Sequence, residues 1–256
     1  MVHHWSRWRR LQAAAAFVAA TVASAQAASA PALSGPKIQT LSLPASGRHG
    51  PLEWRGSGFY VNDQGAVVTA AHVVQDCAQP VLIKDGLQIR PTELRLEREL
   101  DVAILETPRI HGVAAVLGEQ PPASFGVYVA SFVDLLQTPA RNSVLTNAMI
   151  VDGDRLAAGA RRGQFAMVSL AQPGASGSAV MDSDGRVVGM IESRTAPSAE
   201  AGDLSRSTFA TGLASLTTVL TAAHVPFRQS REAQLEPEQS RRDRAAGFTL
   251  GVYCQR

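Results

Sequence analysis

The chain has 256 residues, enough for one large all-β domain or two small domains, and 45% of them are hydrophobic against 18% charged, as in a globular protein with a packed core. The formal net charge is +2, but it includes three arginines from a segment that has the pattern of a secretory signal. Without that segment 21 basic residues face 22 acidic ones, so no basic surplus remains that would favour nucleic acid as a partner.

The first 27 residues have the features of a signal peptide. Three arginines within residues 7–10 precede the uncharged run Leu11–Val22, and Ala25 and Ala27 each complete an A-x-A cleavage pattern. The alternative is an anchoring helix, but about 12 apolar residues are too few to span ~30 Å of hydrocarbon. We therefore expect a signal peptide over residues 1–27, export to the periplasm or the extracellular space, and no stable membrane anchor after cleavage.

A mobile leader is predicted over residues 28–36, and residues 37–227 then alternate short β-rich runs with turn residues. Asp182–Gly185 has turn chemistry between two apolar runs, which predicts a hairpin. Many short strands without long helices between them favour a sandwich or barrel over βαβ units. The predicted strands are Gly58–Val61, Ala66–Thr69, Val81–Lys84, Val102–Glu106, Val127–Phe132, Met149–Val151, Phe165–Leu170 and Val187–Ile191.

Three segments follow these strands. A helix is expected from its cap at Ser215 to Pro226, which ends it. Residues 228–246 are rich in charge and poor in apolar side chains, which predicts a solvated linker. Residues 247–256 turn apolar and β-like again. The residues expected on one face of the helix are Leu216, Val219, Leu220 and His224.

Three local patterns carry the chemistry, although each by itself is more often structural. His72 follows a β-rich run and two alanines, which allow a tight turn beneath an oriented imidazole. Asp101 opens an apolar run, where a carboxylate is costly unless it is paired. Pro173–Ser178 is a Gly/Ser-rich turn around Ser176, which can present a hydroxyl and direct backbone N–H groups at a substrate carbonyl.

Taken together, these patterns resemble the trypsin/chymotrypsin-like serine peptidases, and most closely the bacterial HtrA-like branch. The order His, Asp, Ser is the chymotrypsin-type order. The resemblance covers roughly residues 50 to 224 and implies an all-β, chymotrypsin-like double β-barrel with a short C-terminal helix and a C-terminal β-like extension. The matching segments are Gly56–Phe59, Thr69–His72, Asp101–Ala103, Pro173–Gly177 and Val188–Ile191.

The resemblance also implies roles for individual residues. Ser176 is the expected nucleophile, His72 its general base, and Asp101 the carboxylate that orients the imidazole. The backbone N–H groups of Gly174 and Ser176 are expected to form the oxyanion hole. The implied activity is that of a serine endopeptidase acting through an acyl-enzyme on protein or peptide substrates, without a cofactor.

The sequence departs from the family pattern around the nucleophile. The family commonly continues Ser-Gly-Gly-Pro, whereas Ser178 and Ala179 follow Gly177 here. Ala175 replaces the acidic residue with which zymogen-type relatives bind a new N-terminus, so activation by that route is not expected. About 30 residues follow Pro226, too few for the PDZ domain that many HtrA-like enzymes carry.

Substrate specificity is predicted from positions near the nucleophile. In the family, the residue six before the nucleophile lies at the base of the primary pocket, and here it is Leu170. An apolar base predicts cleavage after small or medium apolar residues, with Glu192 and Arg194 lining the pocket wall. The alternative is that Leu170 belongs to the ordinary core.

Two other functions compete with a peptidase. An esterase of the α/β-hydrolase class needs G-x-S-x-G, which Ser178 breaks, and the βαβ alternation is absent. A catalytically silent relative that acts as a binding module remains open. A metal site is not expected, because the six histidines lack metal-ligand spacing. The sequence does not predict an oligomeric state.

Cys77 and Cys254 are the only cysteines. In an exported chain they predict one disulfide, which would tie the C-terminal segment to the half of the protein that contains His72. The alternative is a buried thiol at Cys77 with a free or intermolecular thiol at Cys254.

Overall fold

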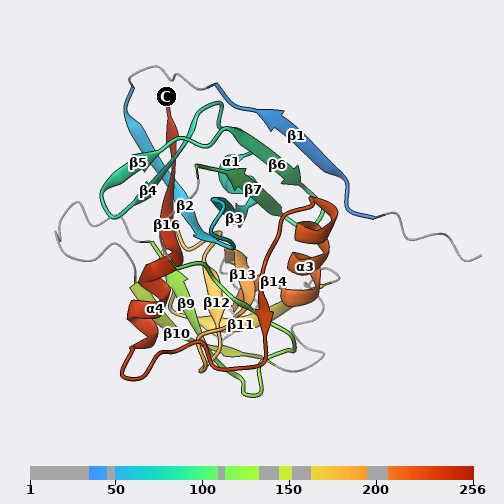
Figure 1. The fold of residues 1–256 in the computed structure, drawn as a ribbon, viewed down its shortest axis with the longest axis vertical. Helices are drawn as coiled ribbons and strands as arrows, with labels where there is room; N and C mark the ends of the chain where they lie inside the picture. Colours follow the sequence, from blue (N-terminus) through green and yellow to red (C-terminus); the bar gives the residue numbers. More distant parts are fainter. Residues whose placement is uncertain (1–34, 45–49, 109–112, 133–143, 152–162, 195–206) are drawn as a thin grey trace, which may run out of the picture. The chain divides into compact units, whose positions relative to one another are not determined.

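The computed structural model describes residues 35–44, 50–108, 113–132, 144–151, 163–194 and 207–256. The predicted signal peptide and nearly all of the predicted leader lie outside these residues. No helix among the described residues has the length and apolar character needed to cross a bilayer. The described chain is dominated by two sheets, so the all-β prediction is confirmed (Figure 1).

The first sheet has eight strands, and most of its pairs are antiparallel neighbours far apart in sequence. The predicted histidine and aspartate lie at the ends of buried strands of this sheet. In spatial order the strands are β1 (Ile38–Ser42), β6 (Glu93–Glu97), β7 (Val102–Glu106), β3 (Ala66–Ala70), β2 (Leu52–Tyr60), β16 (Thr249–Gln255), β4 (Pro80–Lys84) and β5 (Leu87–Ile89).

The second sheet closes on itself, because β12 pairs with β9 at one side and with β13 at the other. The predicted hairpin is confirmed, since Asp182–Gly185 joins β12 to β13 with Gly185 at φ 80°. In spatial order the strands are β12 (Ala179–Met181), β9 (Gly126–Ser131), β10 (Val144–Ile150), β11 (Gln164–Ser169), β14 (Ser207–Gly212), β13 (Val187–Arg194), β8 (Leu117–Gly118) and β15 (Gln229–Ser230).

The C-terminal strand β16 is an interior member of the first sheet. It lies between β2 and β4 and is hydrogen-bonded to both, and all seven of its residues are buried (Figure 1). A disulfide joins Cys254, which lies in this strand, to Cys77. The apolar C-terminal segment therefore completes the sheet that carries His72.

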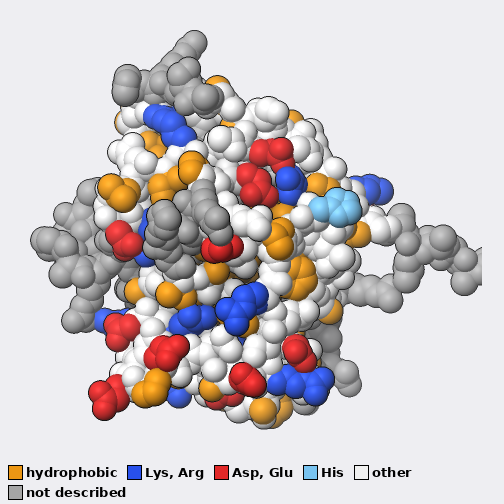
Figure 2. Space-filling view, viewed as in Figure 1, with side chains coloured by type: hydrophobic (Ala, Val, Ile, Leu, Met, Phe, Trp, Pro, Cys, Tyr) orange, Lys and Arg blue, Asp and Glu red, His pale blue; other side chains and the backbone are white. Residues whose placement is uncertain are grey.

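Residues 228–246 differ from the solvated linker that their composition predicts. β15 pairs with β8, and α4 (Arg241–Phe248), capped by Ser240, contacts β9 and β10. The charged side chains are accommodated by bonds at the surface: Arg231 pairs with Glu119, and Arg241 donates to the backbone carbonyl of Ser183. Acidic and basic side chains are interspersed over the face in Figure 2.

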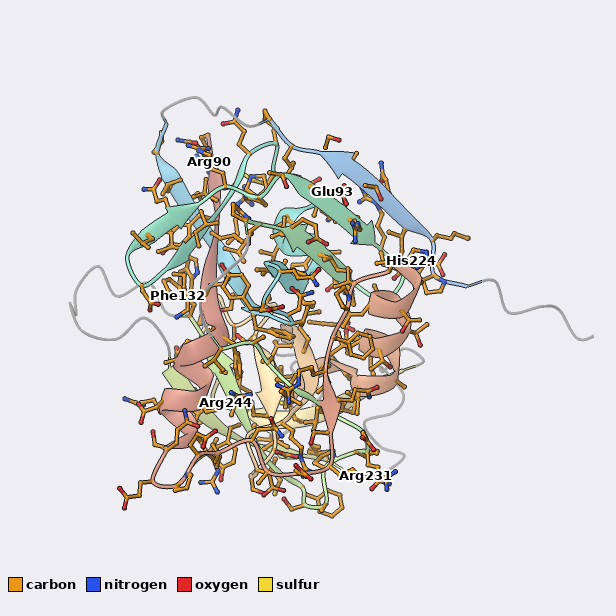
Figure 3. The ribbon with its side chains drawn as sticks, viewed as in Figure 1. Arg90, Glu93, Phe132, His224, Arg231 and Arg244 are labelled. Atoms are coloured by element: carbon orange, nitrogen blue, oxygen red, sulfur yellow. A yellow bond between two sulfur atoms is a disulfide. The ribbon has the colours of Figure 1, made fainter. Side chains whose placement is uncertain are left out.

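Helix α3 (Leu213–Ala222) forms where the sequence predicts a helix, but its ends differ from the prediction. Gly212 occupies the N-cap, and Ser215 lies inside the helix, where its hydroxyl donates to the carbonyl of Gly163. His224 lies past the last turn at φ 55° and is exposed (Figure 3). Leu216, Val219 and Leu220 are buried as expected.

Candidate active site

His72 lies at the junction of β3 and α1 (Ala71–Val74). All five residues of β3 are buried, which fixes the position of the short helix that follows. The backbone N–H of Ala71 donates to the carbonyl of Asp101 at 3.0 Å, so the start of α1 is bonded to the start of β7. The imidazole itself remains open, with 41% of its side chain exposed.

Asp101 contacts His72 through both of its carboxylate oxygens. Oδ2 lies 2.7 Å from Nδ1 of the imidazole, and Oδ1 accepts a 2.9 Å hydrogen bond from the backbone N–H of His72. Asp101 adopts a left-handed backbone conformation, with φ 52°, which a non-glycine residue rarely takes and which clusters at functional sites. The local backbone therefore positions this carboxylate beneath the histidine.

The pKa of His72 is raised above its ordinary value of 6.5. The hydrogen bond that the imidazole donates to Asp101 is the largest cause, and the negative charges of Asp101 and Glu192 add to it, whereas burial opposes them. A carboxylate that accepts from Nδ1 holds the proton on that nitrogen and leaves Nε2 as the acceptor in the neutral ring.

Glu192 is a second carboxylate near this pair. Its side chain is only 2% exposed and is hydrogen-bonded to the amide of Gln164 and to the hydroxyl of Thr211. The hydroxyl of Thr211 also lies 3.2 Å from the carbonyl of Leu100, the residue before Asp101. Glu192 is therefore linked through Thr211 to the segment that carries Asp101.

The loop around Ser176 is shaped by two glycines. Gly174 and Gly177 have φ of 87° and 82°, and a side chain at Gly174 would collide with the ring of Trp54. The carbonyl of Ser176 accepts a 2.8 Å hydrogen bond from the N–H of Ser57, on the strand next to β3. Since only glycine fits these torsions without strain, the two glycines are required for the backbone conformation of the predicted nucleophile turn.

Ser57 connects this loop to its surroundings. Its fully buried hydroxyl donates to the carbonyl of Gly174 at 2.9 Å and accepts from the N–H of Phe132 at 2.9 Å. The hydroxyl thus fixes the peptide unit that follows Gly174. This role of Ser57 was not predicted, although the residue lies in the matching segment Gly56–Phe59.

The backbone N–H groups expected to form the oxyanion hole have no acceptor within the part of the chain that the structure describes. Among the described residues, neither the N–H of Gly174 nor that of Ser176 donates to another group, whereas that of Ala175 donates to Gln172 and that of Gly177 to Ile191. Two unpaired backbone donors that flank Ala175 leave capacity to bind a developing oxyanion.

Ser176 and His72 lie on adjoining segments without a direct hydrogen bond. A Cβ at Gly56 would lie 2.7 Å from the carbonyl oxygen of Ser176 and 3.0 Å from a methyl group of Val73, so Gly56 separates the nucleophile loop from α1. Among the described hydrogen bonds, none joins the Ser176 hydroxyl to the imidazole. Such bonds are often long before substrate binds and tighten in the complex.

The sequence matches the family described as trypsin-like peptidase domain over residues 56–190, more than half of the chain and the stretch that contains all three predicted catalytic residues. The chain belongs to the trypsin-like peptidase family.

A curated protein is similar in sequence to this trypsin-like peptidase. The uncharacterized protein y4bJ of Sinorhizobium fredii is 28% identical over 223 residues, which are 84% of this chain and 34% of that protein. This chain therefore spans about a third of the length of that curated relative.

Solved structures share the fold. The active form of the Rv3671c protease from M. tuberculosis is 20% identical, with a TM-score of 0.53 and coverage of 70% of this chain and 77% of that one. The serine endoprotease from Yersinia pestis is 17% identical, with a TM-score of 0.51 and coverage of 73% and 62%. The chymotrypsin-like double-barrel prediction is thereby confirmed.

The peptidase has a small cavity beside the nucleophile turn. Its volume is about 180 Å³, and its walls include Ile191 and Thr208 in addition to residues 171–176. Thr208 is fully buried, and its hydroxyl has no hydrogen-bond partner among the described residues. The cavity is therefore small and mainly apolar.

Two of the residues predicted to line the substrate pocket, Leu170 and Glu192, do not line this cavity. Leu170 is 62% exposed and does not line the cavity, because the strand ends at Ser169 and the chain turns before Ala171. Glu192 is buried beneath the His72 side of the site rather than in the cavity wall. The side chain of Arg194 lies outside the described part of the structure.

The described residues contain no group of three or more His, Cys, Asp or Glu side chains that could hold a metal ion.

Proposed function

We propose that this trypsin-like peptidase is an exported serine endopeptidase with Ser176 as nucleophile, His72 as general base and Asp101 as the orienting carboxylate. The observation that carries the proposal is the two-point contact of Asp101 with His72, at 2.7 Å from Nδ1 and 2.9 Å from the backbone nitrogen. It supports an imidazole held with its proton on Nδ1 and Nε2 free to act.

The proposed reaction has two steps. Ser176 Oγ attacks the carbonyl carbon of the scissile peptide bond while His72 Nε2 takes its proton, and the free N–H groups of Gly174 and Ser176 stabilise the oxyanion. His72 then gives the proton to the leaving amine as the C–N bond breaks. Water hydrolyses the acyl-enzyme in the same way and restores Ser176.

The preferred substrate residue before the scissile bond is proposed to be small or medium and apolar. A cavity of about 180 Å³ accommodates side chains up to about the size of leucine, and the residues lining it carry no charge. Export is supported by the signal-like pattern of residues 1–27 and by the disulfide, a bond that persists mainly in oxidising compartments.

Labelling of the mature protein with a serine-directed fluorophosphonate tests the proposal. We expect Ser176→Ala to abolish both labelling and hydrolysis of a diverse peptide library, and Ser178→Ala, at a fully buried serine two residues away, to preserve both. Absence of labelling in the native protein would instead favour a binding module. Labelling that survives Ser176→Ala would refute the assignment of the nucleophile.

A further inference from the structure

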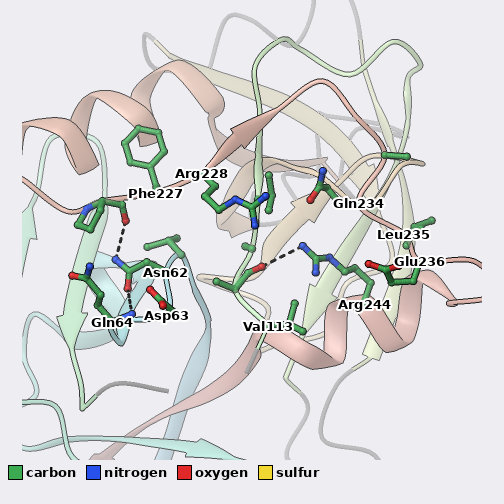
Figure 4. Close-up of a pocket in the computed structure, with 16 residues that line it drawn as sticks. Asn62, Asp63, Gln64, Val113, Phe227, Arg228, Gln234, Leu235, Glu236 and Arg244 are labelled. Atoms are coloured by element: carbon green, nitrogen blue, oxygen red, sulfur yellow. Dashed lines mark hydrogen bonds between the residues drawn. The ribbon is translucent and has the colours of Figure 1, made fainter. Parts of the chain in front are cut away.

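A second and larger cavity, of about 700 Å³, lies at the other end of β3 from His72 (Figure 4). The turn 62–64, between β2 and β3, forms one wall, and residues 226–228 and 233–236 of the C-terminal extension form others. The intervening strand is five residues long, so at ~3.3 Å per residue it separates the cavity from His72 by about 17 Å. The cavity is distinct from the candidate active site.

Arg244 is the buried charged residue of this cavity. It projects from α4 with only 9% of its surface exposed, and one of its terminal nitrogens donates to the carbonyl of Ala114 at 3.2 Å. Its Nε is buried and has no hydrogen-bond partner among the described residues. A permanently charged guanidinium that is desolvated with an unused donor is costly unless an anion compensates it.

Arg228 brings a second positive charge to the same cavity. Its carbonyl accepts from the N–H of Leu117, which fixes its backbone beside β8, while its side chain is exposed and makes no ion pair with any described residue. Figure 4 shows the side chains of Arg228 and Arg244 converging on the hollow from opposite sides.

The surroundings of Arg244 disfavour its positive charge. Burial and then the charge of Arg228 lower the pKa of Arg244, and the opposing charge of Glu236 is the weakest of the three causes. Asp63 also lines the cavity, but on the wall formed by the turn with Asn62 and Gln64 (Figure 4). A negative group placed between the two guanidinium groups would offset their repulsion and accept charge-assisted hydrogen bonds from them.

Other residues that line the cavity indicate which kind of molecule would carry that negative group. Val113, Phe227 and Leu235 present apolar side chains, and the volume is within the range of sites for small organic ligands. We propose that this cavity binds a carboxylate carried on an apolar chain, with the carboxylate between Arg228 and Arg244 and the chain against these apolar residues.

Calorimetric titration of the full chain with octanoate and with octanamide tests the proposal independently of any peptidase activity. We expect octanoate to bind at least about tenfold more tightly than the neutral amide, because only the carboxylate can form charge-assisted hydrogen bonds to the guanidinium groups. Equal binding of the two compounds, or no detectable binding of octanoate at millimolar concentration, would overturn it.

Matched arginine variants locate the binding. Arg228→Gln alters an exposed side chain and should fold normally, and we expect it to weaken octanoate binding at least about fivefold. Arg242→Gln, which removes the same charge from α4 outside the cavity, should leave binding within about twofold of wild type. Equal effects of the two variants would show that octanoate responds only to net charge or binds elsewhere, and would contradict the proposal.

Discussion

The carboxylate of Asp101 holds His72 at two points, the imidazole Nδ1 at 2.7 Å and the backbone nitrogen at 2.9 Å. One oxygen therefore orients the ring while the other fixes the start of the helix that bears it. The left-handed backbone of Asp101 is part of the same arrangement, since it turns the carboxylate back toward α1.

Asp101→Asn should preserve the fold and remove most of the activity. Asparagine tolerates the left-handed conformation and can still accept from the backbone N–H of His72, but it cannot stabilise a protonated imidazole. We expect kcat/KM to fall by about 10⁴-fold, measured on a peptide ester or amide, with an unchanged circular dichroism spectrum. A loss of less than about tenfold would contradict the orienting role of Asp101.

Glu192→Gln should shift the pH dependence of hydrolysis. The negative charge of Glu192 raises the pKa of His72 by favouring the protonated ring, so its removal lowers that pKa and makes the base available at lower pH. The acid limb of kcat/KM between pH 5 and 9 should therefore move toward lower pH. Glu119→Gln, at the exposed pair with Arg231, serves as the control and should not move it; an upward shift for Glu192→Gln would contradict this electrostatic role.

Thr208→Phe should narrow the substrate range. Thr208 lines the 180 Å³ cavity, so the larger ring fills it and should cost substrates with leucine or methionine before the cleaved bond about 10²-fold in kcat/KM relative to alanine. Thr208→Val, which keeps the volume, should leave the preference unchanged. A library profile that is the same for native protein and Thr208→Phe would show that this cavity does not receive the substrate side chain.

Replacement of both Cys77 and Cys254 by serine should destabilise the native protein. The disulfide closes a loop with a sequence separation of 177 residues, for which the chain-entropy relation gives up to about 5 kcal/mol. We expect a lower urea midpoint for the double variant, and the same midpoint for native protein under reducing conditions. An unchanged midpoint in both samples would mean that β16 holds its place without the covalent bond.

Local motifs in the sequence predict much of this fold and site. The eight predicted strands coincide with parts of β2, β3, β4, β7, β9, β10, β11 and β13, because alternating apolar and β-branched residues are a local signal. The short or exposed strands, such as β1, β5 and β15, carry no such signal. The contact between His72 and Asp101 was expected only from the family resemblance, since no local pattern encodes a pairing across 29 residues.

What the sequence did not predict depends on contacts between distant segments. The place of β16 between β2 and β4 is set by pairings across most of the chain, and the docking of residues 228–246 by bonds to the second sheet. The cavity wall at Thr208 similarly depends on the register of β14 against β11 and β13. A weak signal existed at Ser57, whose place between two glycines suggests a closely approached backbone.

The position of β16 in the sequence determines which of the two sheets can be completed first during translation. The strands of the closed second sheet are all translated before Thr249, whereas the sheet that carries His72 lacks an interior strand until β16 has been made. A nascent chain can therefore assemble the serine-bearing sheet first, whereas the histidine-bearing sheet stays incomplete until residues 249–255 have been translated. Cleavage between α3 and β16 would leave this strand held only by the Cys77–Cys254 disulfide and by its pairing with β2 and β4, so the support of the imidazole would then depend on those bonds.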